Sequence, residues 1–263
     1  MSAYMAILSA RFRMLLQYRA AAFAGFATQL FWGLIRVMIF EAFYRSTTQP
    51  QPMQFSQVVT YVWLSQALLG MIPWNVDSEV RGMIRTGTVV YELARPLDLY
   101  ALWYTRAIAQ RSAPTVLRAI PMFIVAGLLL GMQPPPSPAS AAAWVVATVG
   151  ALLLSAALTT LMTLSLLWTI SGEGIVRLMA ALVTIFSGLV LPLPLFPNWA
   201  QPVLNFLPFR GIIDAPLRVY MGHIPPAQIG AVLAHQIGWT LALALLERAL
   251  LARGTRRLVV QGG

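Results

Sequence analysis

Six long apolar segments, separated by short polar ones, determine what this chain can fold into. They lie at residues 20–44, 55–74, 113–132, 141–170, 175–191 and 226–246. A helix needs about 20 apolar residues to cross a bilayer, and in lipid only helices and closed barrels satisfy the backbone polar groups. Only 10% of the residues are charged, compared with about 25% in soluble domains. We therefore predict an all-α membrane protein with six transmembrane helices, forming one domain over residues 1–263.

The residue types that are absent exclude several kinds of chemistry. All 18 basic residues are arginine, and the chain has no cysteine. A phosphate-binding loop of the GxxxxGK[ST] type requires a lysine, so this chain cannot bind ATP in that way. Without cysteine, thiol nucleophiles, disulfides and cysteine metal sites are excluded as well. We expect no cofactor on this chain. The net charge of +10 is explained by membrane topology rather than by binding to nucleic acid.

The arginines indicate which side of the membrane each loop faces. Most of them lie on one side of the predicted spans, near both termini, after the second span and before the fifth. The other side carries Arg45, Arg210 and Arg218. Because short arginine-rich segments remain in the cytoplasm, both termini are predicted to be cytoplasmic, in a bacterial cytoplasmic membrane.

Charges also occur at the start of the chain and inside two spans. Residues 1–19 carry an apolar stripe with arginines beside it, which is typical of a helix lying in the membrane interface. Arg36, in the first span, either extends outward to the interface or pairs with another span, and we favour the first. Arg118, in the third span, lies within reach of the interface, and we favour that position over one on a substrate path.

The most unusual stretch is the charged one at residues 75–99. It holds four of the eight acidic residues of the chain, interleaved with arginines. Asn75 is a candidate N-cap for a helix that runs to Arg85, with Gly87 as its stop. A second short segment is expected before Pro96. Two interpretations remain open: a cytoplasmic docking element, or a solvated loop with an interfacial helix.

A tight turn, SGEG at residues 171–174, precedes the fifth span. Glu173 and Arg177 are four residues apart at the start of that span. Residues at this spacing are neighbours on a helix surface. The pattern indicates either helix capping with an ion pair or a second contact with a cytoplasmic partner.

The region before the last span is apolar but rich in proline. Between Leu191 and Pro216 it carries six prolines, so it cannot form one continuous helix. Irregular backbone survives at membrane depth only inside protein or along a cavity. We therefore predict an external re-entrant hairpin within residues 191–224. Asn198 is expected to cap a short helix there, and Asp214 is expected to face the outer surface.

The order of these features resembles that of the permease subunits of ABC-2 type ATP-binding-cassette exporters. The resemblance rests on the N-terminal helix, IRTGTVVYELARPL at 84–97, SGEGIVRLMAALV at 171–183 and FSGLVLPLPLFPNWAQPVLNFLPF at 186–209. It implies a six-helix bundle that dimerises, and a separate nucleotide-binding ATPase subunit that carries ATP and Mg²⁺. It also implies a coupling helix after the second span, a second contact before the fifth, and a re-entrant gate before the last.

The resemblance also assigns roles to individual residues. The ATPase-coupling residues would be Asp77, Glu79, Arg81, Arg85, Glu92, Arg95, Glu173 and Arg177. The external re-entrant gate would be Pro192, Pro194, Phe196, Pro197, Asn198, Trp199 and Pro208. The chain itself would not be an enzyme. Together with an identical or related permease chain, it would move an apolar or amphipathic substrate, such as a drug, a natural product or a lipid-like molecule, across the bilayer.

Two other classes of function are considered. A self-contained carrier or channel would usually place ionisable groups near the middle of the membrane, whereas most charges here gather at the interfaces. An intramembrane enzyme would require convergent polar groups within the spans, and the spans offer mainly scattered Ser, Thr and Gln. Transport driven by an ion gradient without ATP would support the first class, and catalysis by the purified chain would support the second.

Overall fold

The computed structural model describes residues 3–169 and 172–255, and every regular element in these residues is a helix. The first two residues, Ser171 of the predicted tight turn, and Arg256 and Arg257 lie outside them. In chain order, with η marking short 3-10 helices, the elements are α1 (Ala3–Leu16), α2 (Arg19–Ser46), α3 (Phe55–Ala67), η1 (Leu69–Met71), α4 (Ser78–Thr86), α5 (Val90–Leu93), α6 (Leu99–Leu129), α7 (Pro138–Ser165), α8 (Glu173–Phe186), η2 (Leu193–Leu195), α9 (Gln201–Phe206), η3 (Pro208–Gly211), α10 (Asp214–Tyr220), η4 (Pro226–Gln228) and α11 (Ile229–Gly254). The all-α prediction is confirmed for the described residues.

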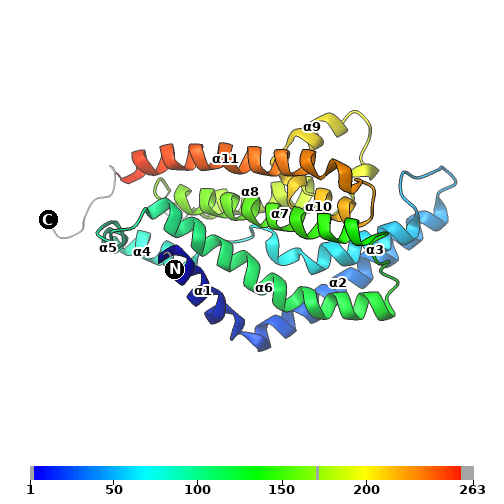
Figure 1. Cartoon of the computed structure of the whole chain (residues 1–263), viewed down its shortest axis with the longest axis horizontal. Helices are drawn as coiled ribbons and strands as arrows, with labels where there is room; N and C mark the ends of the chain where they lie inside the picture. The colour runs from blue at the N-terminus through cyan, green and yellow to red at the C-terminus, as the bar shows by residue number, and fades with distance from the viewer. Residues whose placement is uncertain (1–2, 170–171, 256–263) are drawn as a thin grey trace.

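Four of these helices are long and apolar enough to cross a membrane: α2, α6, α7 and α11 together with η4. They extend along the molecule (Figure 1) and correspond to the first, third, fourth and sixth predicted spans. The second and fifth predicted spans form α3 and α8, which have 13 and 14 residues. At a rise of about 1.5 Å per residue, each is about 20 Å long, shorter than a hydrocarbon core of about 30 Å. Six full crossings therefore remain a prediction.

The helix of the third predicted span, α6, begins earlier than the apolar pattern indicates. The predicted span covers residues 113–132, with Arg106 and Arg111 before it, but α6 already starts at Leu99. Its N-cap is Asp98, whose side chain accepts a hydrogen bond of 2.7 Å from the first turn. The span over 113–132 remains a prediction, and the helix itself extends back to this cap, which the apolar pattern did not indicate. As a result, both arginines lie on a helix of the bundle, and both are buried.

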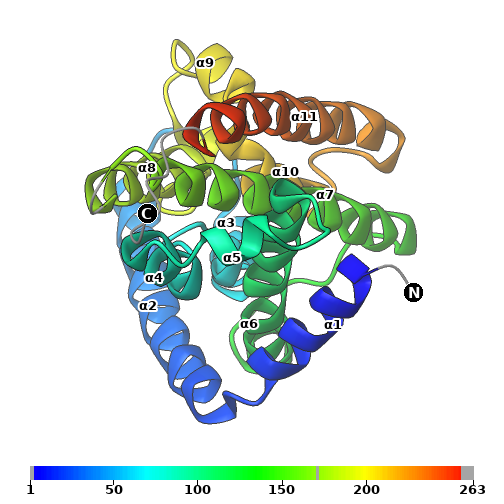
Figure 2. The same ribbon diagram turned by 90° about the vertical axis from the view of Figure 1, so that its left-hand side faces the viewer.

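α3 lies at the centre of the molecule. All of its residues from Val58 to Ala67 are buried, and it lies between α2 and α6 (Figure 2). Gly33 of α2 faces the ring of Trp63, and a Cβ atom at this position would overlap that ring. Because glycine has no side chain, α2 and α3 approach closely here and pack as one unit.

Glycines border α8 at both ends. Gly172 precedes the helix with φ of 62°, and Gly188 follows it with φ of 88°. Both angles lie in the left-handed region, which glycine adopts without steric cost. Of the residues of α8, only Val176 and Val183 are buried. α8 is therefore a short and lightly buried helix between two glycine turns.

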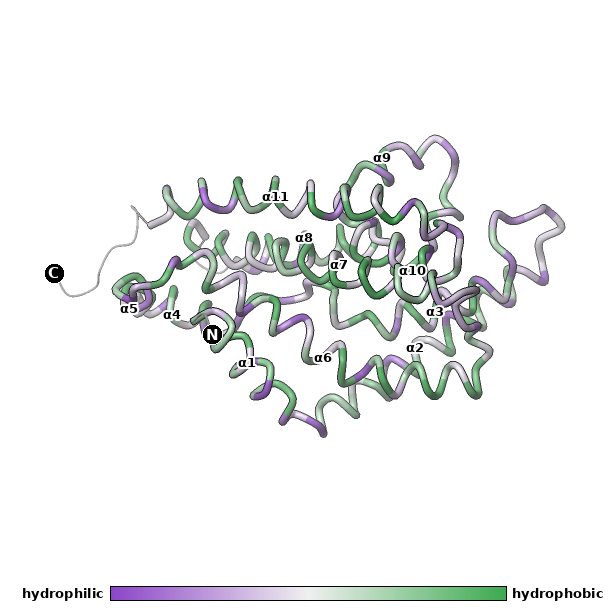
Figure 3. Tube along the Cα trace, viewed as in Figure 1, coloured by the Kyte–Doolittle hydropathy of each residue, from purple (hydrophilic) through white to green (hydrophobic). Residues whose placement is uncertain are grey.

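Hydrophilic residues gather toward the two ends of the bundle (Figure 3). One end holds α4 and α5, and the start of α1 and the end of α11 lie there too (Figure 1). The other half of the molecule holds the loop between α2 and α3 and the short helix α9. The described ends of the chain therefore share one side, as an even number of crossings requires.

The proline-rich region forms the short helices η2, α9, η3 and α10. Asp214 was predicted to face the outer surface. It is instead fully buried and accepts a hydrogen bond from Tyr61 of α3 at 3.1 Å. The expectation was wrong because the apolar neighbours of Asp214 pack into the core. Asn198 does not cap α9 either. That helix begins at Gln201, since Pro202 in its first turn favours a start at this point.

Candidate coupling site

α4 begins and ends where the sequence provides caps. The side chain of Asp77 accepts hydrogen bonds from the backbone N–H of Glu79 at 2.9 Å and of Val80 at 3.4 Å. The prediction that Asn75 caps this helix is wrong by two residues, and the N-cap is Asp77. A charged carboxylate is favoured at a helix N-terminus, which explains the choice of Asp77. Gly87 ends the helix with φ of 74°, as predicted.

One face of α4 packs against the bundle. Val80 is buried, and Met83 and Ile84 pack beside it on a cluster that includes Leu102 and Trp103 of α6. This apolar face holds α4 across the end of α6. The opposite face of α4 is open to solvent.

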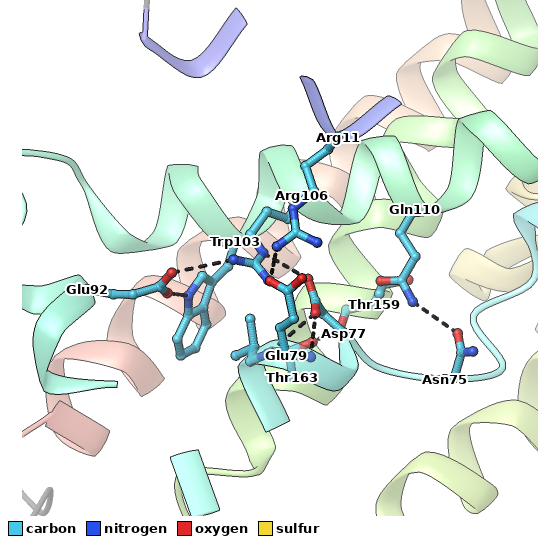
Figure 4. Close-up of polar contacts among 11 residues, drawn as sticks. Arg11, Asn75, Asp77, Glu79, Glu92, Trp103, Arg106, Gln110, Thr159 and Thr163 are labelled. Atoms are coloured by element: carbon cyan, nitrogen blue, oxygen red, sulfur yellow. Dashed lines mark hydrogen bonds and ion pairs between the residues drawn. The ribbon is translucent and has the colours of Figure 1, made fainter. Parts of the chain in front are cut away.

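Arg106 of α6 connects three acidic side chains of this region (Figure 4). Its guanidinium donates to Asp77 at 2.8 Å, to Glu79 at 2.7 Å and to Glu92 at 3.4 Å. Only 7% of the Arg106 side chain is exposed, and Glu92 is buried with it. Buried charges are stable only when they are paired and hydrogen-bonded, so this contact differs in kind from an exposed ion pair.

Two further residues complete the cluster. Arg11 of α1 forms an ion pair with Glu79, and Trp103 Nε1 donates to Glu92 at 2.7 Å. The helix predicted to lie in the interface is thereby bound to α4 through its arginine. We name this cluster the Arg106 junction; its members are Arg11, Asp77, Glu79, Glu92, Trp103 and Arg106. It ties α1, α4 and α5 to α6.

The Arg106 junction keeps two of its carboxylates ionised. Burial alone would raise the pKa of Asp77, but the hydrogen bond and charge of Arg106, together with the charge of Arg11, hold that pKa below its ordinary value. Burial would also raise the pKa of Glu79, but its bonds to Arg11 and Arg106 hold that pKa below its ordinary value. Both groups therefore carry a negative charge at neutral pH.

A second arginine of α6 fixes the segment that leads into α4. Arg111 is 4% exposed and donates to the carbonyl of Ile72 at 2.8 Å and to Oδ1 of Asn75 at 3.1 Å. Its Nε donates to the hydroxyl of Thr159 in α7 at 2.9 Å. Because one guanidinium binds all three partners, the segment before α4 is held against both α6 and α7.

The arginines among the predicted coupling residues lie on the outside. Arg85 and Arg95 are exposed, and Arg81 is partly exposed. None of the three takes part in an ion pair with another described residue. Tyr91, between them in the sequence, is 72% exposed. The predicted set is thus divided: its three acids before residue 95 belong to the Arg106 junction, and its three arginines there lie outside it, two of them exposed and Arg81 in part.

Glu173 and Arg177 lie at the start of α8 and form the ion pair that their spacing indicates, at 3.1 Å. Both side chains are more than half exposed. Val176, in the same turn, packs in a cluster with Val76 and with Ile84 of α4. The structure therefore brings the second predicted contact and α4 to the same end of the bundle.

A family model described as ABC-2 family transporter protein matches residues 19–262. The match covers nearly the whole chain. The chain belongs to the ABC-2 transporter family. No curated protein and no solved structure gives a significant match. The resemblance seen in the sequence is thus confirmed, and the protein is a multi-pass membrane component of the ABC-2 permease type, which is not itself the catalytic subunit.

The predicted gate residues of this ABC-2 permease follow α8 and extend to the start of η3. Trp199 is 81% exposed, and Pro197 and Asn198 beside it are exposed too. The others are more buried: Pro192 and Pro208 fully, Pro194 and Phe196 in part. The set therefore extends from the surface of the permease into its interior rather than forming one cluster.

Sequence reasoning missed Arg106 and Arg111 as members of the candidate coupling site. Arg106 lies 29 residues after Asp77, and no helical or strand periodicity relates residues at such a distance. One signal was available, because arginines on an apolar helix require partners. Half of the acidic residues of the chain lie in the stretch just before this helix.

Proposed function

We propose that this ABC-2 permease is the transmembrane subunit of an ATP-driven exporter, and that a separate ATPase subunit holds the ATP and Mg²⁺. The observation that carries the proposal is the Arg106 junction. It joins α4, whose outer face is open to a partner, to α6, which extends from this end toward the other end of the bundle (Figure 1). A displacement of α4 by the ATPase is then transmitted to a long helix through a buried, hydrogen-bonded contact.

The end with α4 and α5 is assigned to the cytoplasm of a bacterial cell, together with both termini. The support is the distribution of arginines, since short arginine-rich segments stay on the cytoplasmic side. The region 191–224 then lies outside as a re-entrant gate over the exit. Its support is the largely buried segment from Pro208 to Tyr220, whose two short helices, η3 and α10, are enclosed by protein.

The ATPase surface that fits α4 and α5 is acidic and offers a site for an aromatic ring. Arg81, Arg85 and Arg95 present positive charge without an internal counter-ion, beside the exposed Tyr91. Complementary charge guides association, and buried aromatic side chains contribute much of the affinity of interfaces. The ion pair at the start of α8 forms the second contact with the same subunit.

A second permease chain, identical or related, completes the transport path. α2, α3 and α8, the first, second and fifth predicted spans, line that path. Large apolar side chains of α2, including Phe31, Trp32 and Met38, are exposed on the isolated chain and offer a surface for the second copy and for lipid. The low charge of these helices favours an apolar or amphipathic substrate, such as a drug, a natural product or a lipid-like molecule.

The test is co-purification from the native membrane with charge reversals on the open face of α4. The tagged full-length permease, gently solubilised, should retain a P-loop ATPase in stoichiometric amount. The double variant Arg81→Glu and Arg85→Glu should retain roughly tenfold less, because like charges would then face each other across the interface. Arg45→Glu, which reverses an exposed arginine at the opposite end, is the matched control and should retain the wild-type amount.

Equal recovery of the ATPase with the double variant and with the wild type would reject the coupling surface. A second permease sequence in the complex would identify a hetero-dimer. A folded permease that purifies alone and transports along an ion gradient without ATP would reject the exporter function and support a self-contained carrier or channel.

A further inference from the structure

An open-sided cavity of about 750 Å³ lies between α2, the end of α3 with η1, and the end of α8 with residues 189–191, away from the Arg106 junction. Its wall is mostly apolar, with Trp32, Phe40 and Leu189 among the lining side chains. The volume lies within the range of about 300–1,000 Å³ that is typical of small-molecule sites. Burial against this wall favours the apolar body of a ligand.

One cation interrupts the apolar wall. Arg36 of α2 lines the cavity, and its guanidinium donates to Ser65 Oγ at 2.9 Å and to the carbonyl of Val190 at 3.1 Å. Of the two positions considered for Arg36, these contacts support pairing with another span over extension to the interface. Both acceptors are neutral. Among the ion pairs of the described residues, none includes Arg36.

Two buried glutamines lie near this cation. With its amide in the orientation that suits its neighbours, Gln66 accepts a hydrogen bond from Arg36 at 3.2 Å and donates one to the backbone carbonyl of Gln29 at 3.2 Å. Gln29 itself is 2% exposed, and neither polar atom of its side-chain amide has a hydrogen-bond partner. It lines the same cavity, two helical turns before Arg36 on the same face of α2.

Among the described residues, the cavity therefore provides no anion for Arg36 and no hydrogen-bond acceptor for the side-chain amide of Gln29. A guanidinium without a counter-ion inside an apolar site is costly unless an anion neutralises it. A buried amide without a partner also lowers stability until its N–H groups find an acceptor. Carboxylates and phosphates accept two hydrogen bonds from a guanidinium and further bonds from amides. One acidic group would therefore satisfy Arg36 and Gln29 together.

We propose that this cavity binds an amphiphile that consists of an apolar body and one acidic group, a carboxylate or a phosphate. Arg36 and Gln29 hold the acidic group, and Trp32, Phe40 and Leu189 surround the apolar body. The inference rests on the proposed exporter function, because it names the substrate class of the same permease. The site discriminates against amphiphiles with a cationic head, which would place two positive charges together.

The test is the binding of matched amphiphiles to the purified full-length permease in phosphatidylcholine nanodiscs, without ATPase. The probe is dansyl-labelled undecanoic acid, detected by energy transfer from tryptophan, since Trp32 and Trp74 line the cavity. The acid should bind about tenfold more tightly than the dansyl-labelled alcohol or amine of the same length, as expected for hydrogen bonds to a charged group.

Substitutions test whether Arg36 causes the preference for the acid over the alcohol and the amine. Arg36→Gln should abolish the preference for the acid, whereas Arg36→Lys, which keeps the charge, should retain most of it. Arg118→Gln is the matched control, because Arg118 also lies on a long apolar helix, packs against Gly25 and does not line this cavity. It should leave the preference unchanged.

Equal affinity of the wild type for the acid, the alcohol and the amine would overturn the inference, whatever the stability of the variants. An unchanged preference in folded Arg36→Gln would also overturn it. Nanodiscs with phosphatidylglycerol separate two sources of the anion. Displacement of the probe would identify a lipid headgroup as the ligand, and retention would identify a free amphiphile, both in agreement with the inference. Because no ATPase is present, failure here is independent of the co-purification test.

Discussion

Arg106 in α6 donates a hydrogen bond of 2.8 Å to Asp77, the residue that caps α4. The two oxygens of this carboxylate have different partners. Oδ1 accepts from the first turn of α4, and Oδ2 accepts from Arg106. The start of α4 and the side of α6 are therefore joined through one side chain, and α4 cannot be displaced from α6 without breaking a buried ion pair.

Removal of the central cation should destabilise the permease strongly. Arg106→Met leaves Glu92 buried and Asp77 partly buried without a counter-ion, and the loss of one partner of a buried pair costs about 3–5 kcal/mol. Arg248→Met removes an arginine from an exposed pair with Asp98 and should cost less than about 1 kcal/mol. Thermal unfolding in detergent, followed by tryptophan fluorescence, measures both variants. Equal shifts would show that the Arg106 junction is no stronger than a surface pair.

The contribution of the Arg106 junction should depend on pH in a defined direction. The pKa of Asp77 is held below its ordinary value of 3.8, and that of Glu79 below 4.5. Groups with lowered pKa values stabilise the folded state above their unfolded pKa, and this contribution is lost as the pH falls through the folded pKa. Most of the effect should come from Asp77, because Glu79 is half exposed.

The measurement is the difference in Tm between the wild type and Arg106→Met across a pH series. This difference should be largest at neutral pH and should shrink as the pH falls, because Asp77 without Arg106 takes up its proton at a higher pH than in the wild type. A difference that stayed constant into the acid range would mean that Asp77 and Glu79 do not provide the stabilising charge.

The cap and the ion pair of Asp77 can be separated by substitution. Asparagine caps helices about as well as aspartate but carries no charge, so Asp77→Asn should preserve α4 and weaken its tie to α6. Alanine removes both contacts. In the assembled complex, Asp77→Asn should keep the ATPase bound but lower the amount of substrate transported per ATP. Normal transport per ATP in the asparagine variant, with loss only in the alanine variant, would restrict the role of Asp77 to capping.

The close contact between α2 and α3 should not tolerate a methyl group. Gly33→Ala places a Cβ atom in the ring of Trp63, and overpacking of this kind costs about 1–3 kcal/mol. Gly127→Ala in α6 is the matched control, since the nearest atom to its Cβ would be Met132 Cε at 3.9 Å. That variant should be neutral or slightly stabilising, as alanine favours helices. Thermal unfolding distinguishes the two, and equal Tm values would contradict the packing.

Local sequence signals predicted much of this fold and little of the site. The four longest spans followed from hydropathy, and the end of α4 followed from Gly87, because these features depend on neighbouring residues. The helices α3 and α8 are shorter than the spans predicted for them. The chain ends them at turns that depend on tertiary packing, which hydropathy does not report. The inward position of Asp214 also depended on tertiary contacts with Tyr61.

The predicted coupling residues remain a prediction, and which of them face inward could not be read from the sequence. Acids and arginines are interleaved between residues 77 and 95, so composition does not show which side chains face inward and which face outward. That direction comes from Arg106, which lies on another helix and binds the acids. The unbalanced charge of Arg36 was visible in the sequence, whereas its neutral partners Ser65 and Val190 were not.

The close fit of Gly33 against Trp63 also limits how the cavity around Arg36 can change shape. Two of its walls, α2 and α3, are closely packed on each other, so the volume of the cavity depends on the third wall, which is Thr184 of α8 and residues 189–191 after that helix. Glycine turns at Gly172 and Gly188 border that helix, and its first turn carries Glu173 and Arg177. In the proposed transport cycle, a contact with the ATPase at Glu173 and Arg177 would therefore reach the proposed amphiphile site through α8 itself.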